Sequence, residues 1–252
     1  MKLENKIIVV TGAGSGIGAS SAALMASLGA RVIASDINLK NAEEVVSKIR
    51  ESGGKATALK VDVTKYEEVK LLLNQVVKDH GSIDVLVNNA GIGGKNQNKT
   101  AEHTLDDWHN VIAVNQTGVF YCMKLVLKQM MLQGYGNIIN IASLAGLKPS
   151  GNNLSYSASK FAVVGMTKSA GLEYGHKNIR INAVCPGYTH SSLLDQLLSS
   201  RPDMEQRLKQ LIPMGRFGEA SEIAETVAWL ASDSSKYITG QTITIDGGTS
   251  LY

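Results

Sequence analysis

Short runs of β-branched and aliphatic residues recur along the chain and alternate with longer segments of amphipathic spacing. Several runs are apolar at nearly every position, which is typical of parallel strands covered by helices on both faces. The segments between them are long enough to be helices. The pattern therefore predicts an α/β fold, a doubly wound parallel sheet. The seven predicted strands lie at residues 6–12, 31–36, 55–62, 83–91, 137–143, 179–187 and 241–248.

The same alternation continues through the whole chain. No Pro/Ser-rich linker and no internal repeat interrupts the 252 residues, so we expect a single domain over residues 1–252. Residues 188–213 form an excursion before the last predicted helix and strand. Within it, "SSLLDQLLSS" at 191–200 has the spacing of a short amphipathic helix, which suggests a lid over a site.

Composition narrows the class of protein. The formal net charge is only +3 and both signs are interspersed, so we expect neither nucleic acid nor a membrane surface as a partner. The apolar run at 7–10 is too short for a signal peptide or a membrane span. Cys122 and Cys185 lie far apart and form no metal-ligand pair. We therefore predict a cytoplasmic protein without a metal site.

A glycine-rich turn joins the first predicted strand to the first helix. Glycine occupies positions 12, 14, 16 and 18, in the pattern T-G-x-x-x-G-x-G rather than G-x-G-x-x-G. Residues without side chains let the backbone approach a pyrophosphate, and the following helix N-terminus offers N–H donors. The alternative is a tight turn that needs glycine only for its dihedral angles.

Asp36 at the end of the second strand favours the first interpretation. A carboxylate at this distance from the turn can accept hydrogen bonds from an adenosine ribose and repel a 2′-phosphate. Its neighbours include no arginine, and Ser15 in the turn is not basic. We therefore predict that the cofactor is NAD.

Tyr156 and Lys160 stand four residues apart in a segment of helical spacing, 13 residues after Ser143. Residues i and i+4 share a helix face. A phenol transfers protons poorly at neutral pH unless a nearby cation favours the phenolate, and Lys160 would supply that cation. Taken singly, Tyr156 also fits a half-buried structural tyrosine, and Lys160 a solvated surface lysine.

Further motifs occur in a characteristic order along the chain. They are Thr11-Gly12-x-x-x-Gly16-x-Gly18, Asn88-Asn89-Ala90-Gly91, Asn115, Ser143, Tyr156-x-x-x-Lys160 and Pro186-Gly187. Together they resemble the short-chain dehydrogenase/reductase family, a group of NAD(P)-dependent enzymes with a Rossmann fold. The resemblance covers essentially the whole chain.

The resemblance implies a role for each matched residue. Tyr156 would be the general acid or base, and Ser143 would polarise the carbonyl oxygen. Lys160 would lower the pKa of Tyr156 and hold the nicotinamide ribose, while Asn115 would hold a water that relays protons. Because asparagine is a mediocre helix former, we also expect a local kink at Asn115.

The predicted cofactor contacts extend beyond the turn and Asp36. Thr189 and Ser191 stand where family members often have a β-branched aliphatic residue and a threonine, although both can still make the contacts. Asp62 also fits a helix-capping role. The full predicted set is Gly12, Ser15, Gly16, Ile17, Gly18, Asp36, Asp62, Val63, Asn89, Ala90, Gly91, Tyr156, Lys160, Pro186, Gly187, Thr189 and Ser191.

The substrate pocket is expected between loop 91–103, residues 144–154 and residues 188–212. Besides Ser143 and Tyr156, the candidate substrate contacts are Leu144, Leu147, Asn152, Asn153 and Tyr188. This mixed apolar and polar lining is compatible with many small alcohols or ketones.

The leading hypothesis is an NAD-dependent oxidoreductase for a secondary alcohol or its ketone, assembled as a homotetramer like many family members. One alternative is a 3-oxoacyl-(acyl-carrier-protein) reductase. Asp36 disfavours it because such reductases usually take NADPH, and no cluster of basic residues is expected near the cleft. The other alternative is a non-catalytic dinucleotide-binding regulator, which would not need the set Asn115, Ser143, Tyr156 and Lys160.

Overall fold

All seven predicted strands lie in one parallel sheet, in the order β3-β2-β1-β4-β5-β6-β7, which confirms the predicted fold class. The computed structural model describes residues 1–95, 98–200 and 203–251. The chain order reverses between β1 and β4, and open α/β sheets bind ligands at such a switch point. The strands are β1 (Ile7–Thr11), β2 (Arg31–Asp36), β3 (Lys55–Lys60), β4 (Val85–Asn88), β5 (Gly136–Ile141), β6 (Ile179–Pro186) and β7 (Thr242–Ile245).

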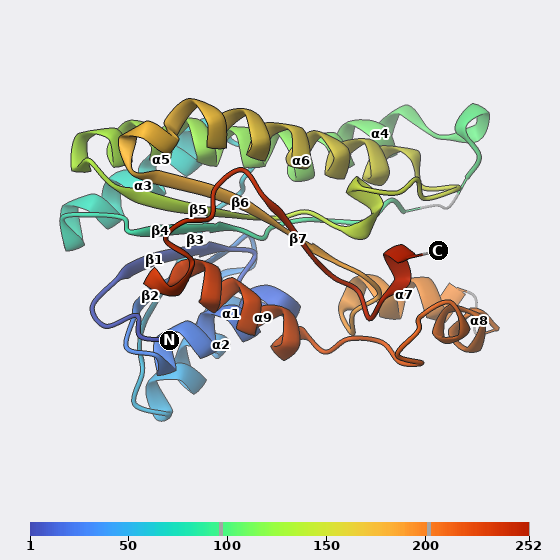
Figure 1. Cartoon of the computed structure of the whole chain (residues 1–252), viewed down its shortest axis with the longest axis horizontal. Helices are drawn as coiled ribbons and strands as arrows, with labels where there is room; N and C mark the ends of the chain where they lie inside the picture. The colour runs from blue at the N-terminus through green and yellow to red at the C-terminus, as the bar shows by residue number, and fades with distance from the viewer. Residues whose placement is uncertain (96–97, 201–202, 252) are drawn as a thin grey trace.

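Helices cover both faces of the sheet (Figure 1). On one face lie α3, α5 and α6, with α4 leading into α5, and on the other face lie α1, α2 and α9. The helices are α1 (Gly16–Ser27), α2 (Leu39–Glu51), α3 (Tyr66–His80), α4 (Leu105–Ile112), α5 (Val119–Gln133), α6 (Leu154–Tyr174), α7 (Ser192–Ser200), α8 (Met204–Gln210) and α9 (Ala220–Ala231).

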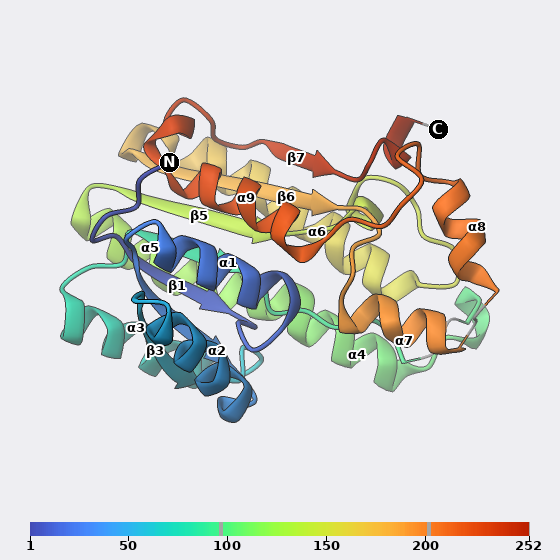
Figure 2. The same cartoon turned by 90° about the horizontal axis from the view of Figure 1, so that it is seen from below.

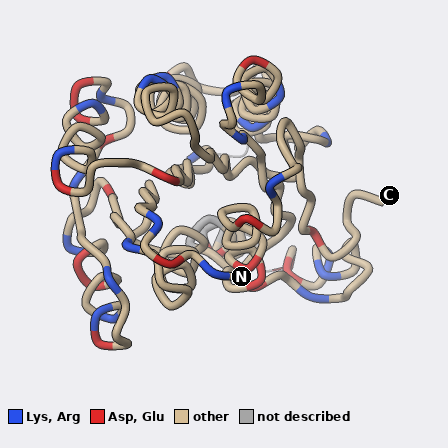
Figure 3. The backbone as a smooth tube through the Cα atoms, turned by 60° about the vertical axis from the view of Figure 1, so that its left-hand side comes forward, with Lys and Arg blue, Asp and Glu red and all other residues tan. Residues whose placement is uncertain are grey.

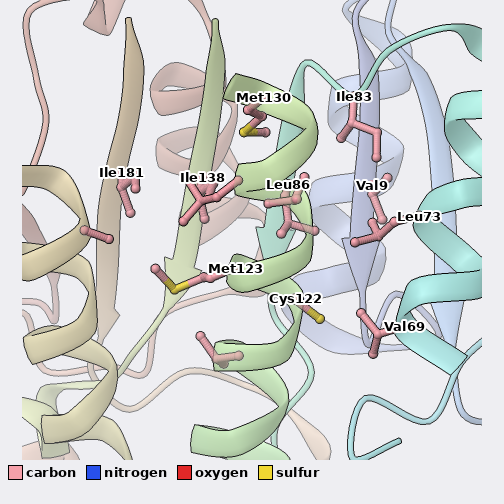
Figure 4. Close-up of a cluster of buried hydrophobic side chains, with 14 of the residues drawn as sticks. Val9, Val69, Leu73, Ile83, Leu86, Cys122, Met123, Met130, Ile138 and Ile181 are labelled. Atoms are coloured by element: carbon pink, nitrogen blue, oxygen red, sulfur yellow. The ribbon is translucent and has the colours of Figure 1, made fainter. Parts of the chain in front are cut away.

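The strand residues alternate between two apolar layers. Val9 and Ile138 point toward α3, α5 and α6, where Val9 lies beside Leu73 and Ile138 beside Met123 (Figure 4). Their neighbours Ile8 and Ile139 face the layer under α1 and α9. Burial on both faces explains why the strands are apolar at nearly every position.

The excursion lies at the carboxyl ends of the strands. Figure 2 shows the arrowheads of β1, β5, β6 and β7 pointing toward the end where α7 and α8 lie. The helix predicted at 191–200 is α7. The excursion continues past the predicted end at 213, because Thr189 pairs with Gly218 in a parallel bridge that closes it.

Lys, Arg, Asp and Glu are interspersed along the backbone, as the sequence indicates (Figure 3). In the part of the chain that is described, no helix is both long and apolar enough to cross a membrane. Four predicted strands end two or three residues early, at Lys60 (β3), Asn88 (β4), Ile141 (β5) and Ile245 (β7). Residues that follow β3, β4 and β5 line the cleft described below.

Candidate active site

A cleft of about 1270 Å³ opens at the carboxyl ends of the strands, at the switch point between β1 and β4. Such a volume exceeds the usual range for one small ligand and leaves room for a dinucleotide beside a substrate. Most predicted site residues lie on its wall. They are Gly12, Ser15, Gly16, Ile17, Asp36, Asp62, Val63, Asn89, Ala90, Gly91, Ser143, Leu144, Asn153, Tyr156, Lys160, Pro186, Gly187, Tyr188, Thr189 and Ser191.

The glycine-rich turn adopts a conformation that requires its glycines. Gly12 and Gly16 have φ of +63° and +54°, in the left-handed region. Asn89 Nδ2 donates to the carbonyl oxygens of Thr11 (3.0 Å) and Gly12 (2.9 Å), so the loop after β4 holds the turn in place. The exposed backbone beside the α1 N-terminus fits a pyrophosphate.

Gly18 differs from its predicted role as a cofactor contact, because it does not line the cleft. A Cβ atom there would collide with the Gly12 carbonyl oxygen and the Asn89 side chain. Gly18 is thus required for close packing of α1 under the turn rather than for an exposed surface. The spacing of the motif could not separate these two uses of glycine.

Asp36 is anchored at the other end of the turn. Its Oδ2 accepts the Gly14 N–H and its Oδ1 the Asn38 N–H, each at 2.9 Å. The cleft residues near it along the sheet edge are Ile37 and the segment 61–63, which includes no lysine or arginine. The end of the cleft beside Asp36 therefore carries negative charge.

Asp62 lines the cleft, but its predicted helix-capping role is wrong. It lies on the cleft wall, two residues beyond the end of β3, while its Oδ1 accepts both the N–H and the hydroxyl of Thr64 at 2.9 and 2.7 Å. These bonds form a turn that leads toward α3, whose N-cap is Lys65. Asp62 therefore shapes the turn before the helix without being its cap.

Ser143, Tyr156 and Lys160 come together on one wall of the cleft. Ser143 follows β5, and the other two lie in the first turns of α6. Lys160 Nζ donates to the Ile141 carbonyl oxygen at 2.8 Å and lies 5.7 Å from the centroid of the Tyr156 ring. The strand end and the helix thus place a hydroxyl, a phenol and an ammonium group side by side.

Burial shifts the pKa values of both Tyr156 and Lys160, and the direction for Tyr156 is opposite to the prediction. Burial raises the pKa of the Tyr156 phenol, while a hydrogen bond with Ser143 opposes this shift. The sequence predicts that Lys160 lowers this pKa, but the effect of burial prevails. Burial also lowers the pKa of Lys160 from 10.5 to about 8. Both shifts have the same cause, the cost of placing a charge away from water.

Asn115 lies in a π-helical segment, Ala113–Gly118, between α4 and α5. This irregularity agrees with the predicted kink, although Asn115 is fully buried and does not line the cleft. Its side chain accepts the Ile92 N–H (2.8 Å), donates to the Ile92 carbonyl oxygen (2.9 Å) and donates to Ser159 Oγ (3.2 Å). Asn115 therefore ties the loop after β4 to α6.

The predicted substrate contacts divide into two groups. Leu144, Asn153 and Tyr188 lie on the cleft wall, whereas Leu147 and Asn152 do not. Leu147 packs against the core, and Asn152 occupies a left-handed turn position (φ +59°). Positions 96–97 and 201–202, within or near the predicted lining segments, lie outside the described residues.

The three segments expected to line the substrate pocket, 91–103, 144–154 and 188–212, supply most of the other cleft residues, although these residues were not singled out one by one. They are Ile92, Gly93, Gly94, Lys95, Asn98, Ala145, Lys148, Pro149, Ser150, Gly151, Leu194, Leu197, Ser199, Met204 and Leu211. The cleft residues outside the predicted segments and contacts are Ile37, Val61, Val114, Ile141, Ala142 and Thr249. Among the described residues no group of His, Cys, Asp and Glu is arranged to hold a metal ion.

The chain matches a family model described as "Enoyl-(Acyl carrier protein) reductase" over residues 12–250. It is 42% identical over 246 residues to cyclohexanol dehydrogenase from Acinetobacter sp. (strain SE19), covering 98% of this chain and 95% of that protein. It is 40% identical over 253 residues to the 3-oxoacyl-(acyl-carrier-protein) reductase FabG of Thermotoga maritima, covering 98% and 99%.

Solved structures of oxidoreductases are also similar to this chain over nearly its whole length. The crystal structure of NAD⁺-bound xylitol dehydrogenase superposes with a TM-score of 0.95 at 35% identity, covering 98% of this chain and all of that one. A variant actinorhodin polyketide ketoreductase with NADPH gives 0.94 at 35% identity, and each chain is fully covered. Both cofactor forms thus occur among the structural neighbours. The chain belongs to the short-chain dehydrogenase/reductase family of oxidoreductases.

Proposed function

We propose that the protein transfers a hydride between NAD(H) and a secondary alcohol or its ketone. The observation that carries the proposal is the arrangement of Asp36, whose carboxylate is held on the cleft wall by two backbone N–H groups. An adenosine ribose can donate hydrogen bonds to this carboxylate. A 2′-phosphate would meet the negative charges of Asp36 and Asp62 without a lysine or arginine near them on the described wall.

The nicotinamide, when bound, supplies or accepts the hydride. In the oxidation of an alcohol, the Tyr156 oxygen takes the hydroxyl proton, and in the reduction of a ketone it returns a proton to the carbonyl oxygen. Ser143 donates a hydrogen bond to the same oxygen and stabilises the charge that develops there. The Lys160 ammonium, 5.7 Å from the centroid of the Tyr156 ring, favours the phenolate and so opposes the effect of burial.

This proposal is tested by steady-state kinetics with NAD⁺ and NADP⁺ over a panel of secondary alcohols that includes cyclohexanol. We expect kcat/KM to favour NAD⁺ by tenfold or more, roughly the effect of one unfavourable charge contact of about 1.4 kcal/mol. A preference for NADP⁺ would contradict the proposed role of Asp36.

The variant Tyr156→Phe removes only the hydroxyl group. We expect kcat to fall by about 10²- to 10⁴-fold, the usual contribution of a positioned proton donor, with NADH affinity unchanged by fluorescence titration. The control is Tyr174→Phe, at the other end of α6 and away from the cleft, which should retain activity. Retained turnover in Tyr156→Phe would remove Tyr156 from the mechanism.

Reduction of a 3-oxoacyl thioester is the second candidate function. It is supported by the 40% identity to FabG and by two lysines, Lys95 and Lys148, which line the cleft although the sequence led us to expect no basic cluster there. Rates with acetoacetyl-coenzyme A and each reduced cofactor would separate the two functions. Efficient reduction with NADPH would favour the thioester.

A further inference from the structure

The wall of the cleft beyond Ser143 and Tyr156 is formed partly by two loops, one after β4 and one after β5. Each loop brings one lysine to the wall, Lys95 from the first and Lys148 from the second. Neither belongs to the glycine-rich turn, to Asp36 or to the Ser143, Tyr156 and Lys160 group. The proposed proton transfer therefore leaves both side chains without a role.

Charge is distributed unevenly along the cleft. The carboxylates on its described wall are Asp36, which ends β2, and Asp62, which follows β3, both at the proposed adenosine end. On the described wall of the substrate side, Lys95 and Lys148 join Lys160 and no carboxylate faces them. Within the described ranges neither Lys95 nor Lys148 forms an ion pair, in contrast to Lys70 and Lys209 on the surface.

A hydrogen bond to a buried aspartate fixes the backbone at Lys95. Its N–H donates to Asp107 Oδ1 at 2.9 Å, and Asp107 is only 4% exposed. The other carboxylate oxygen of Asp107 faces His103 Nε2 at 3.6 Å, and Asp107 does not line the cleft. This negative charge thus lies beneath the loop and fixes its course, while the Lys95 ammonium has no acidic partner on the cleft wall.

The backbone at Lys148 is also fixed. Its N–H donates to the Leu144 carbonyl oxygen at 2.9 Å, which closes the turn that starts at Ser143. Lys148 is half-buried, so part of its aliphatic stem lies against the wall. A short, hydrogen-bonded turn therefore connects the residue that would bind the reacting oxygen to this second ammonium group.

We propose that Lys95 and Lys148 form an anion subsite, and that the substrate is an alcohol or ketone carrying an anionic group away from the reacting carbon, a carboxylate in the first instance. This inference rests on the proposed oxidoreductase function and specifies its substrate class. Charge-assisted hydrogen bonds to a carboxylate strengthen when a bound ligand excludes water. A phosphate offers the same chemistry, so the experiment includes one.

The test compares two substrates that differ only in the anion, cyclohexanol and 4-hydroxycyclohexanecarboxylate. We expect the parent enzyme to favour the carboxylate by about tenfold in kcat/KM, mainly through KM, and added salt to reduce this preference. In the double variant Lys95→Gln/Lys148→Gln the preference should disappear while kcat/KM for cyclohexanol is unchanged. The control Lys99→Gln, an exposed lysine of the same loop that does not line the cleft, should behave as the parent.

A second measurement is independent of turnover. Calorimetric titration of the protein with cyclohexanecarboxylate, in the presence of NADH, should show binding that weakens about tenfold in the double variant. Equal affinity for cyclohexanecarboxylate and cyclohexanol in the parent, or unchanged affinity in the double variant, would overturn the proposal. Oxidation of cyclohexanol without such a preference would leave the oxidoreductase function intact.

Acetoacetyl-coenzyme A provides the phosphate arm of the experiment. If the double variant loses activity on this thioester but binds the carboxylate as the parent does, the subsite serves the phosphates of a thioester substrate. That result would overturn the carboxylate assignment. We expect instead that the double variant loses affinity for the carboxylate.

Discussion

Burial of the Lys160 ammonium lowers the stability of the folded protein, although the proposed mechanism uses this same group. Lys160 is 4% exposed, its Nζ donates to the Ile141 carbonyl oxygen, and burial lowers its pKa to about 8. The folded protein therefore releases this proton at a lower pH than the unfolded chain, whose lysine has an ordinary pKa of 10.5. Between these values the unfolded state binds more protons, so stability increases with pH.

This argument predicts a pH-dependent difference between the parent and Lys160→Met. From pH 7 to pH 9.5, the free energy of unfolding of the parent should rise relative to the variant by about 2 kcal/mol. Urea titrations at both pH values measure this, and other titrating groups cancel in the comparison. Lys168→Met, an exposed position on α6, is the control and should show a constant difference. A constant difference for Lys160→Met would mean that its ammonium is not destabilised by burial.

At the same scale, the sequence predicts the chemistry of individual residues better than their surroundings. Tyr156 and Lys160 share a wall as their spacing indicates, and Ser143 joins them as the family resemblance implies. The pKa of Tyr156 is raised because burial outweighs the influences that lower it, and a sequence does not contain the depth of a side chain. Gly18 shows the same limit, since glycine serves both backbone exposure and close packing.

At the scale of elements, the π-helical segment Ala113–Gly118 joins α4 to α5 and presents Asn115 to two neighbours. The side chain satisfies both backbone polar groups of Ile92 as well as the Ser159 hydroxyl. An irregular turn of helix thus anchors the loop after β4 on one side and the first part of α6 on the other.

We predict that Asn115→Ala destabilises the protein by about 1–3 kcal/mol, because the Ile92 backbone groups lose buried partners. The free energy of unfolding from urea titration tests this. Asn110→Ala is a matched control on the exposed surface of α4 and should change stability by less than about 0.5 kcal/mol. Equal effects of the two substitutions would contradict the anchoring role.

Elements were predicted more reliably than their connections. The strands could be recognised because burial on both sheet faces leaves short continuous apolar runs, and α7 because its apolar residues have amphipathic spacing. The loops carrying Lys95 and Lys148 have no period, and their course depends on single contacts such as that of Asp107. The excursion likewise runs past residue 213, because its end is fixed by the bridge between Thr189 and Gly218.

At the scale of the whole molecule, large apolar side chains remain exposed on α5 and α6. Phe120 and Phe161 are each 46% exposed and Leu172 is 86% exposed, on two helices of the same layer (Figure 1). Neighbouring exposed apolar side chains of this size are typical of association surfaces. They support the prediction of a homotetramer made from the family resemblance.

Static light scattering at two concentrations tests this prediction, with an expected mass about four times the 26.9 kDa of one chain. The double variant Phe161→Glu/Leu172→Glu should reduce the mass, because charges would be buried without partners in the interface. Leu71→Glu, at a 66% exposed position on α3, should leave it unchanged. A monomeric parent protein at both concentrations would contradict the prediction.

The contacts of Asn115 also connect substrate recognition with the rate of the chemical step. The chain of hydrogen bonds runs from Ile92 through Asn115 to Ser159, whose hydroxyl donates to the Tyr156 carbonyl oxygen at 2.7 Å. A displacement of the loop that carries Lys95 would therefore move the backbone that positions the proposed proton donor. Substitutions that shift the Ile92 backbone should alter kcat together with KM, whereas exchanges of the Lys95 or Lys99 side chain that leave this backbone in place should not alter kcat. A change of substrate range therefore preserves the speed of the enzyme only where the anchor at Ile92 stays fixed.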